Sequence, residues 1–256
     1  MTGILAALQD LMGGALAGAG FVFLRIGAAM ALLPAFGERS IPLRVRLVLV
    51  IAFTMIVLPA VLDRFPETSA GPDIWRLAAV EVFAGLAIGS VLRLMVLVLQ
   101  MAGTIAANVT SLSQIIGGAS VDPQPAIAHV LVVGGLALAA MAGLHVKAAA
   151  AIILSYEVFP PGELIPADGF AAWGADRVAH AFALAFTLSA PFVLVSVVYN
   201  LALGAINRAM PQLMVAFVGA PAITMAALVL MALSAPFLLG LWSVAFDAAL
   251  SGLGTR

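Results

Sequence analysis

An uncharged run from Leu94 to Val121 is the feature that most restricts how this chain can fold. It is long enough to cross a bilayer, which takes about 20 apolar residues as a helix. Its second half nevertheless carries a polar set: Asn108, Thr110, Ser111, Ser113 and Gln114, followed by Gly117 and Gly118. Polar or irregular backbone survives at membrane depth where protein or water surrounds it. We interpret this stretch either as the lining or plug of a passage, or as a hydrated loop between two ordinary helices.

Charged residues are scarce along the whole chain, at 9% against 64% apolar residues and a mean hydropathy of +1.20. Soluble domains average about 25% charged residues. We therefore predict an all-α polytopic membrane protein that forms a single integral membrane domain over residues 1–256. The chain has no basic stripe for nucleic acid. Without cysteine it has neither a disulfide framework nor a thiolate metal site.

About six apolar segments are expected, and several are expected to be kinked. The predicted ranges are 11–34, 47–62, 77–121 with a break around Asn108–Gly118, 126–155, 178–206 with a kink at Pro191, and 210–247 as a kinked helix or a hairpin. The loop 35–46 carries three arginines, Arg39, Arg44 and Arg46, which place it in the cytoplasm by the positive-inside rule. The acidic loop 156–177 is expected on the outer face.

Four charges fall within the apolar segments: Arg25, Glu81, Arg93 and Lys147. A central arginine costs about 2.5–3.5 kcal/mol on insertion scales, so Arg25 should face protein or water. Glu81 and Arg93 are twelve residues apart and therefore point about 120° apart on a helix. They should pair with other segments or with partner subunits rather than with each other. We predict that Arg25 meets Glu81.

Small and polar residues indicate close helix packing. Gly85 and Gly89 form a small-xxx-small pair that lets a neighbouring helix approach. Asn200 and Asn207 are seven residues apart and share a helix face. Amides between membrane helices contribute roughly 0.6–2 kcal/mol each, so this face should pack within the chain or against a partner.

No catalytic chemistry is apparent in the sequence. It lacks a phosphate-binding loop, a zinc-protease motif and a Cys/His cluster. His129, His145 and His180 are far apart, and no nucleophile has a positioned base. We therefore predict no catalytic residue, no cofactor and no metal.

Two longer motifs carry a resemblance to a known family. Residues 34–46 read PAFGERSIPLRVR, and residues 200–213 read NLALGAINRAMPQL, followed by Phe217-Val-Gly219. The second motif contains Asn200, Asn207 and Arg208. With the mid-chain Asp122-Pro123 and the Pro160-Pro161-Gly162 turn, this pattern resembles the FliR family of flagellar export-gate proteins over nearly the whole chain.

The resemblance implies a non-enzymatic subunit of the flagellar export gate in the bacterial inner membrane and the flagellar basal body. Such a protein is similar to a fused FliP-like and FliQ-like unit with kinked helical hairpins, and much of its assembly stands on the periplasmic side. Its implied partners are FliP-like and FliQ-like subunits, FlhB-like and FlhA-like export proteins, unfolded flagellar export substrates and the lipid bilayer.

A plug loop of the family would map onto residues 104–122, although this chain is more polar there than is usual. The candidate plug and pore residues are Ile105, Asn108, Leu112, Gln114, Ile115, Ile116, Gly117 and Gly118. The isoleucines and Leu112 could form a dry constriction, with the two glycines as a hinge. The main alternative is a small-solute secondary transporter with broken helices, although the sequence shows no inverted repeat.

Overall fold

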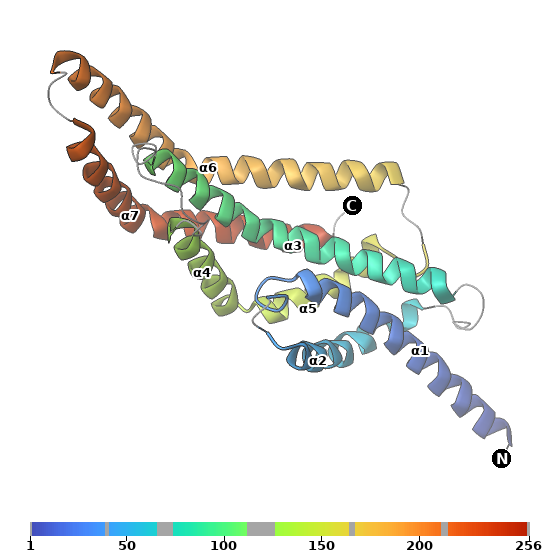
Figure 1. The fold of residues 1–256 in the computed structure, drawn as a ribbon. Helices are drawn as coiled ribbons and strands as arrows, with labels where there is room; N and C mark the ends of the chain where they lie inside the picture. Colours follow the sequence, from blue (N-terminus) through green and yellow to red (C-terminus); the bar gives the residue numbers. More distant parts are fainter. Residues whose placement is uncertain are drawn as a thin grey trace. The chain divides into compact units, whose positions relative to one another are not determined.

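The computed structural model of the protein describes residues 2–38, 41–65, 74–111, 126–163, 167–210 and 215–254. These residues form α-helices and two 3₁₀ turns (Figure 1). The α-helices are α1 (Thr2–Leu32), α2 (Leu43–Val61), α3 (Ile74–Ser111), α4 (Ala126–Met141), α5 (Leu144–Val158), α6 (Ala167–Ala209) and α7 (Val215–Ser251); the 3₁₀ turns are η1 (Leu62–Arg64) and η3 (Gly252–Gly254).

Five helical stretches are long and apolar enough to cross a membrane: Ala15–Leu32, Leu43–Arg64, Ile74–Val109, Asp168–Ala209 and Ala222–Ser251. The pair α4 and α5 passes the same test as one broken span, which brings the number to six. The prediction of an all-α polytopic membrane protein with about six apolar segments is confirmed.

The predicted segment 126–155 is wrong as a single helix. The chain leaves α4 at Met141 and bends by 75° before α5 begins at Leu144. Gly143 lies between them with a φ of 79°, a left-handed conformation that glycine adopts without a steric penalty. A glycine among apolar residues gave too weak a signal to predict this break.

Other boundaries differ from the prediction because polar residues lie within the helices. Helix α6 begins at Ala167, directly after Pro166, so the predicted loop 156–177 is much shorter than expected. The helix continues through Pro191, and Figure 1 shows it changing direction along its length. Of the two alternatives for the last segment, the single long helix is observed, as α7.

The predicted break in residues 77–121 is tested in part. Helix α3 is continuous from Ile74 to Ser111, so Asn108, Thr110 and Ser111 belong to its last turn. The remainder of the predicted break, from Leu112 to Gly118, lies outside the described residues.

The chain divides into two compact units that share several helices. The first contains residues 1–94, 139–175 and 245–256, and the second contains residues 95–138 and 176–244. Helices α3, α4, α6 and α7 each contribute to both units. The single domain over 1–256 stays a prediction, with this subdivision inside it.

In the first unit, α1 packs closely against α3 through two glycines. A side chain at Gly85 would overlap the Arg25 carbonyl oxygen, and one at Gly89 would lie 2.6 Å from the Ala29 carbonyl oxygen. The predicted close-packing pair is therefore confirmed. An aromatic cluster joins the start of α6 to this unit, with ring centroids of Phe83 and Phe170 4.6 Å apart and those of Phe170 and Trp173 5.5 Å apart.

The second unit is organised around the buried Trp242 of α7. Its Nε1 donates a hydrogen bond of 2.8 Å to the Met95 carbonyl oxygen of α3, and the side chain is fully buried. Gly135 of α4 leaves room for Leu99 of α3, because a Cβ there would overlap Leu99 Cδ1, and it lies within contact distance of the same indole ring. Helix α4 also crosses α3 tightly, since a Cβ at Gly103 would overlap the Ala128 backbone.

Replacing Trp242 with phenylalanine is expected to destabilise the protein by about 1–2 kcal/mol. The change removes the hydrogen bond to Met95, worth about 0.5–1.5 kcal/mol, and part of a buried ring. Thermal denaturation of the tagged protein in mild detergent should show a lower midpoint temperature. Trp75→Phe is the matched control, because Trp75 is 81% exposed. Equal shifts for the two variants would contradict the anchoring role of Trp242.

Candidate functional site

Arg25, in the middle of α1, lies fully buried against Glu81 of α3. Its Nε donates to Glu81 Oε2 at 2.6 Å, and its Nη2 donates to Glu81 Oε1 at 3.0 Å. This two-point contact uses the planar guanidinium fully and is a geometry that lysine could not reproduce. The predicted pairing of Arg25 with Glu81 is confirmed.

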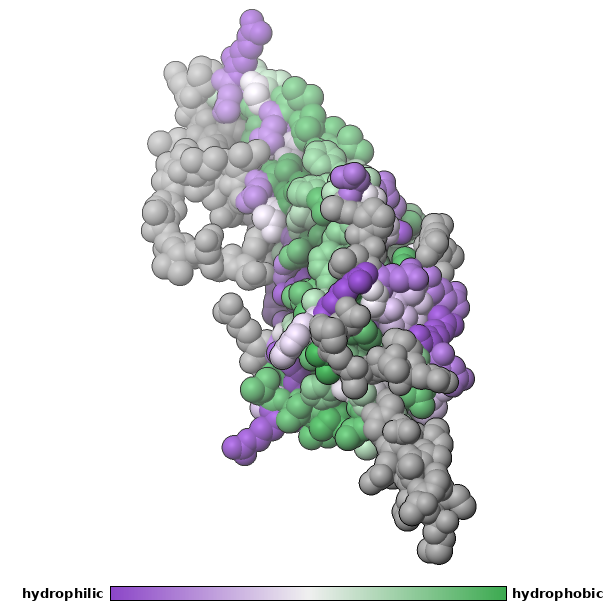
Figure 2. All heavy atoms as spheres, turned by 90° about the vertical axis from the view of Figure 1, so that its right-hand side faces the viewer, coloured by the Kyte–Doolittle hydropathy of each residue, from purple (hydrophilic) through white to green (hydrophobic). Residues whose placement is uncertain are grey.

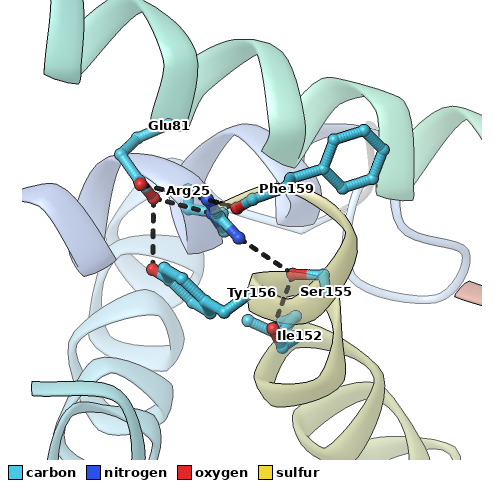
Figure 3. A network of polar contacts seen from close by, with 6 residues as sticks. All are labelled: Arg25, Glu81, Ile152, Ser155, Tyr156 and Phe159. Atoms are coloured by element: carbon cyan, nitrogen blue, oxygen red, sulfur yellow. Dashed lines mark hydrogen bonds and ion pairs between the residues drawn. The ribbon is translucent and has the colours of Figure 1, made fainter. Parts of the chain in front are cut away.

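The remaining contacts of this pair come from α5 (Figure 3). Arg25 Nη1 donates to Ser155 Oγ at 3.1 Å, and Nη2 donates to the Phe159 carbonyl oxygen at 2.8 Å. Tyr156 donates its hydroxyl to Glu81 Oε2 at 3.1 Å. The Tyr156 ring also lies under the guanidinium, with Arg25 Cζ 3.5 Å from the ring centroid.

The network satisfies the groups it buries. Ser155 accepts from Arg25 and donates to the Ile152 carbonyl oxygen at 2.6 Å. Phe159 directly follows α5, where carbonyls lack partners within the helix. Opposite charges with nearly complete hydrogen bonding can persist in a low-dielectric interior, whereas either charge by itself would be costly there. The arrangement therefore joins α1, α3 and α5 through a network of hydrogen bonds.

The other charges of the apolar segments also have partners. Arg93 Nη1 lies 2.7 Å from Glu38 Oε1, and Lys147 Nζ lies 2.6 Å from Asp247 Oδ1. Glu81 and Arg93 thus pair with different segments, as their 120° separation on α3 predicts. Among the residues that the structure describes, no group of three or more His, Cys, Asp or Glu could hold a metal ion.

The three arginines of the predicted loop 35–46 do not all lie in a loop. Arg44 and Arg46 belong to the first turn of α2, which begins at Leu43. Arg44 is exposed, while Arg46 is half-buried and donates from Nη2 to the Glu38 carbonyl oxygen at 3.1 Å. Arg39 lies outside the described residues.

Only the first two of the candidate plug residues lie in the part of the chain that the structure describes. Ile105 is half-buried and Asn108 is exposed, both near the end of α3. The others, Leu112, Gln114, Ile115, Ile116, Gly117 and Gly118, lie outside the part of the chain that the structure describes.

The late motif lies on the exposed part of α6. Asn200, Asn207 and Arg208 are all exposed. Within this chain Asn200 bonds to its own helix, donating to the Ser196 carbonyl oxygen at 2.8 Å and to Ser196 Oγ at 3.0 Å. These hydrogen bonds do not reach another helix, so the expected packing of this face, within the chain or against a partner, stays a prediction.

Sequence reasoning missed the partners that α5 supplies, Ser155 and Tyr156, and also Ser196 of α6. Each is a polar residue in a largely apolar helix, which is a signal for a buried contact but does not identify its partner. Ser196 is nearly fully buried, and its hydroxyl donates to the Val109 carbonyl oxygen of α3 at 2.7 Å.

Large apolar side chains remain exposed on several helices, and apolar residues cover much of the described surface in Figure 2. On α6 they include Phe182, Phe186 and Leu201; on α7 they include Leu233, Phe237 and Val244. An exposed apolar area of this extent requires lipid or protein to cover it.

Comparison with known proteins gives a consistent result. The model of the family described as bacterial export proteins, family 1, matches residues 16–249. The chain is similar to the flagellar biosynthetic protein FliR of Caulobacter vibrioides, with 35% identity over 230 residues that cover 88% of this chain and 91% of that protein. It is 27% identical over 231 residues to the protein of the same name from Escherichia coli, covering 88% of each. It is also 27% identical over 205 residues to that of Bacillus subtilis, covering 78% of this chain and 79% of that protein.

Proposed function

Because the chain belongs to family 1 of the bacterial export proteins, the family of FliR, we propose that it is a non-enzymatic subunit of a flagellar export apparatus, integral to the bacterial inner membrane. The observation that carries this proposal is the family match over residues 16–249, nearly the full length of the helical chain. The five or six apolar spans fit an integral membrane component.

The paired charges support a structural role over a transport role. A secondary transporter places ionisable groups and broken helices around a substrate site at the bilayer midplane. Here Arg25, Glu81, Arg93 and Lys147 each have an opposite charge as partner in the described chain. Their interactions hold helices together, so the family membership and the contacts favour the same function.

The proposal extends to the assembly. The chain joins FliP-like and FliQ-like subunits in a protein-conducting channel for unfolded flagellar subunits, with FlhB-like and FlhA-like proteins as further partners. The end of α6 supports this, because residues 201–210 are exposed almost all round the helix. Leu201 and Ile206 lie there beside Asn207 and Arg208, and this mixture is better covered by a partner protein than by lipid tails.

The same proposal places the plug of the channel at residues 104–122. Support comes from the polar composition of this stretch within an uncharged run and from its place after the long helix α3. In this arrangement much of the assembly stands on the periplasmic side of the membrane.

Mass spectrometry of the tagged protein, purified in mild detergent from its native membrane, tests the assembly. FliP-like and FliQ-like subunits should be recovered in excess over a single copy of this chain. A stable particle that contains this chain without them would contradict the proposal, and transport assays on Glu81 and Arg93 variants would then follow.

A further inference from the structure

The last turn of α3 is held from the side by a residue of α6. Val109 lies two residues before Ser111, the last residue of α3 that the structure describes. Ser196 Oγ lies 2.7 Å from the Val109 carbonyl oxygen, and Ser196 is 1% exposed. Val109, Ser196 and Asn200 all belong to the second unit.

This contact departs from how other helical hydroxyls of the chain are used. Serines and threonines in helices commonly bond back to a carbonyl of the preceding turn. Ser155, Ser189 and Ser243 donate to the carbonyl three residues earlier in their own helices, and Thr54 and Thr187 donate to the one four residues earlier. Ser196 instead donates to a different helix.

The contacts of Ser196 with Val109 and Asn200 fix which group donates in each hydrogen bond. A carbonyl oxygen can only accept, so the single hydroxyl proton of Ser196 must point to Val109. Ser196 Oγ is then free to accept, and Asn200 Nδ2 lies 3.0 Å from it while also donating to the Ser196 carbonyl oxygen at 2.8 Å. The Asn200 amide therefore donates to both oxygens of Ser196, and the hydroxyl proton of Ser196 points to α3.

We infer that Ser196 and Asn200 act together as a positioning pair that holds the C-terminal part of α3 against α6 at Val109. Donation from Asn200 to Ser196 strengthens donation from Ser196 to Val109, as in other chains of hydrogen bonds. Val109 lies within residues 104–122, the stretch proposed above as the plug, so the pair anchors the first part of that stretch to α6. This consequence for the plug rests on the proposed function, whereas the contact between the helices does not.

Hydrogen exchange of the full chain in its native complex tests the contact. In Ser196→Ala, amides of the last described turn of α3, followed in a peptide ending at Ser111, should exchange about tenfold faster, because the Val109 carbonyl has lost its hydrogen bond to α6. Asn200→Asp should have a similar effect, although the hydrogen bonds of Asn200 stay within α6. A carboxylate can only accept, so it would attract the Ser196 proton away from Val109.

The chain offers matched controls on the same helix. Ser189 is also fully buried but donates within α6, and Asn207 is exposed without the bond to Ser196. Ser189→Ala and Asn207→Asp should leave exchange at the end of α3 unchanged. Unchanged exchange in Ser196→Ala, or equal acceleration around Arg93, would overturn the inference. If exchange accelerates as expected while export and membrane leakage stay normal, the positioning role of the pair stands and the plug proposal fails.

Discussion

Replacing Arg25 with methionine is expected to destabilise the protein by about 3–5 kcal/mol, the typical cost of leaving one member of a buried ion pair without its partner. Glu81 would keep the hydroxyl of Tyr156 but lose both contacts with the guanidinium. Since native proteins are stable by about 5–15 kcal/mol in total, little tagged protein should remain in the membrane. Quantitative immunoblotting of membranes, with swimming motility as a second readout, measures this.

A double change separates loss of pairing from loss of volume. Arg25→Met together with Glu81→Met removes both charges, and such replacements of buried pairs are often close to neutral. The double variant should therefore accumulate better than either single variant. Exchanging the two residues should recover less, because a carboxylate at position 25 would face the Phe159 carbonyl oxygen. A double variant as defective as the sum of the single variants would show that the charges do not depend on each other.

Arg93→Met is the control for Arg25→Met, because it removes an arginine from an ion pair that is partly exposed. Its contact with Glu38, at 2.7 Å, is nearly as short as the 2.6 Å contact of Arg25 with Glu81, but the two side chains are 34% and 36% exposed. Pairs that retain contact with solvent contribute about 0–1 kcal/mol. Membrane levels of this variant should stay close to those of the parent.

Gly85→Ala should destabilise the protein by about 1–3 kcal/mol, the usual range for overpacking. The new Cβ would overlap the Arg25 carbonyl oxygen and lie 2.8 Å from Ala28 Cβ. A backbone carbonyl cannot rotate away, so α1 would have to move off α3. That movement would also stretch the bonds between Arg25 and Glu81. Thermal denaturation in detergent and membrane levels should both decline.

Glycines in open positions provide the comparison. At Gly20, Gly204 and Gly240 a Cβ would meet nothing within 4 Å. Alanine there should be tolerated or should stabilise the helix by up to about 1 kcal/mol, the difference in helix propensity. Equal losses for Gly85→Ala and Gly20→Ala would contradict a specific contact between α1 and α3.

The sequence was sufficient to predict most of the helices, because continuous apolar runs report directly on membrane spans. It was also sufficient to pair Arg25 with Glu81, since a buried arginine needs a carboxylate and few were available. The break at Gly143 was missed because a single glycine within an apolar run is common in membrane helices. The start of α6 was missed because Asp168 and Asp176 indicate a loop, although both are helical in the structure.

Contacts between distant segments were the least predictable part of the site. Tyr156 and Ser155 reach Arg25 across a separation of about 130 residues, and Ser196 reaches Val109 across 87. Hydrophobic periodicity shows which side of a helix is apolar, but it does not identify the residue opposite. The Asn200 amide illustrates this limit, because its helical spacing with Asn207 suggested an interhelical contact while its hydrogen bonds stay within α6.

The separation of Arg25 from its partners also has a consequence during synthesis. Arg25 is 56 residues ahead of Glu81 and 134 ahead of Phe159. At about 5–20 residues per second, the guanidinium waits about 3–11 s for its counter-ion and about 7–27 s for the last acceptor. An unpaired arginine at mid-membrane is costly throughout that interval. The insertion machinery must therefore retain α1 beside water or protein until α3 has been made. The paired helices then enter the lipid together.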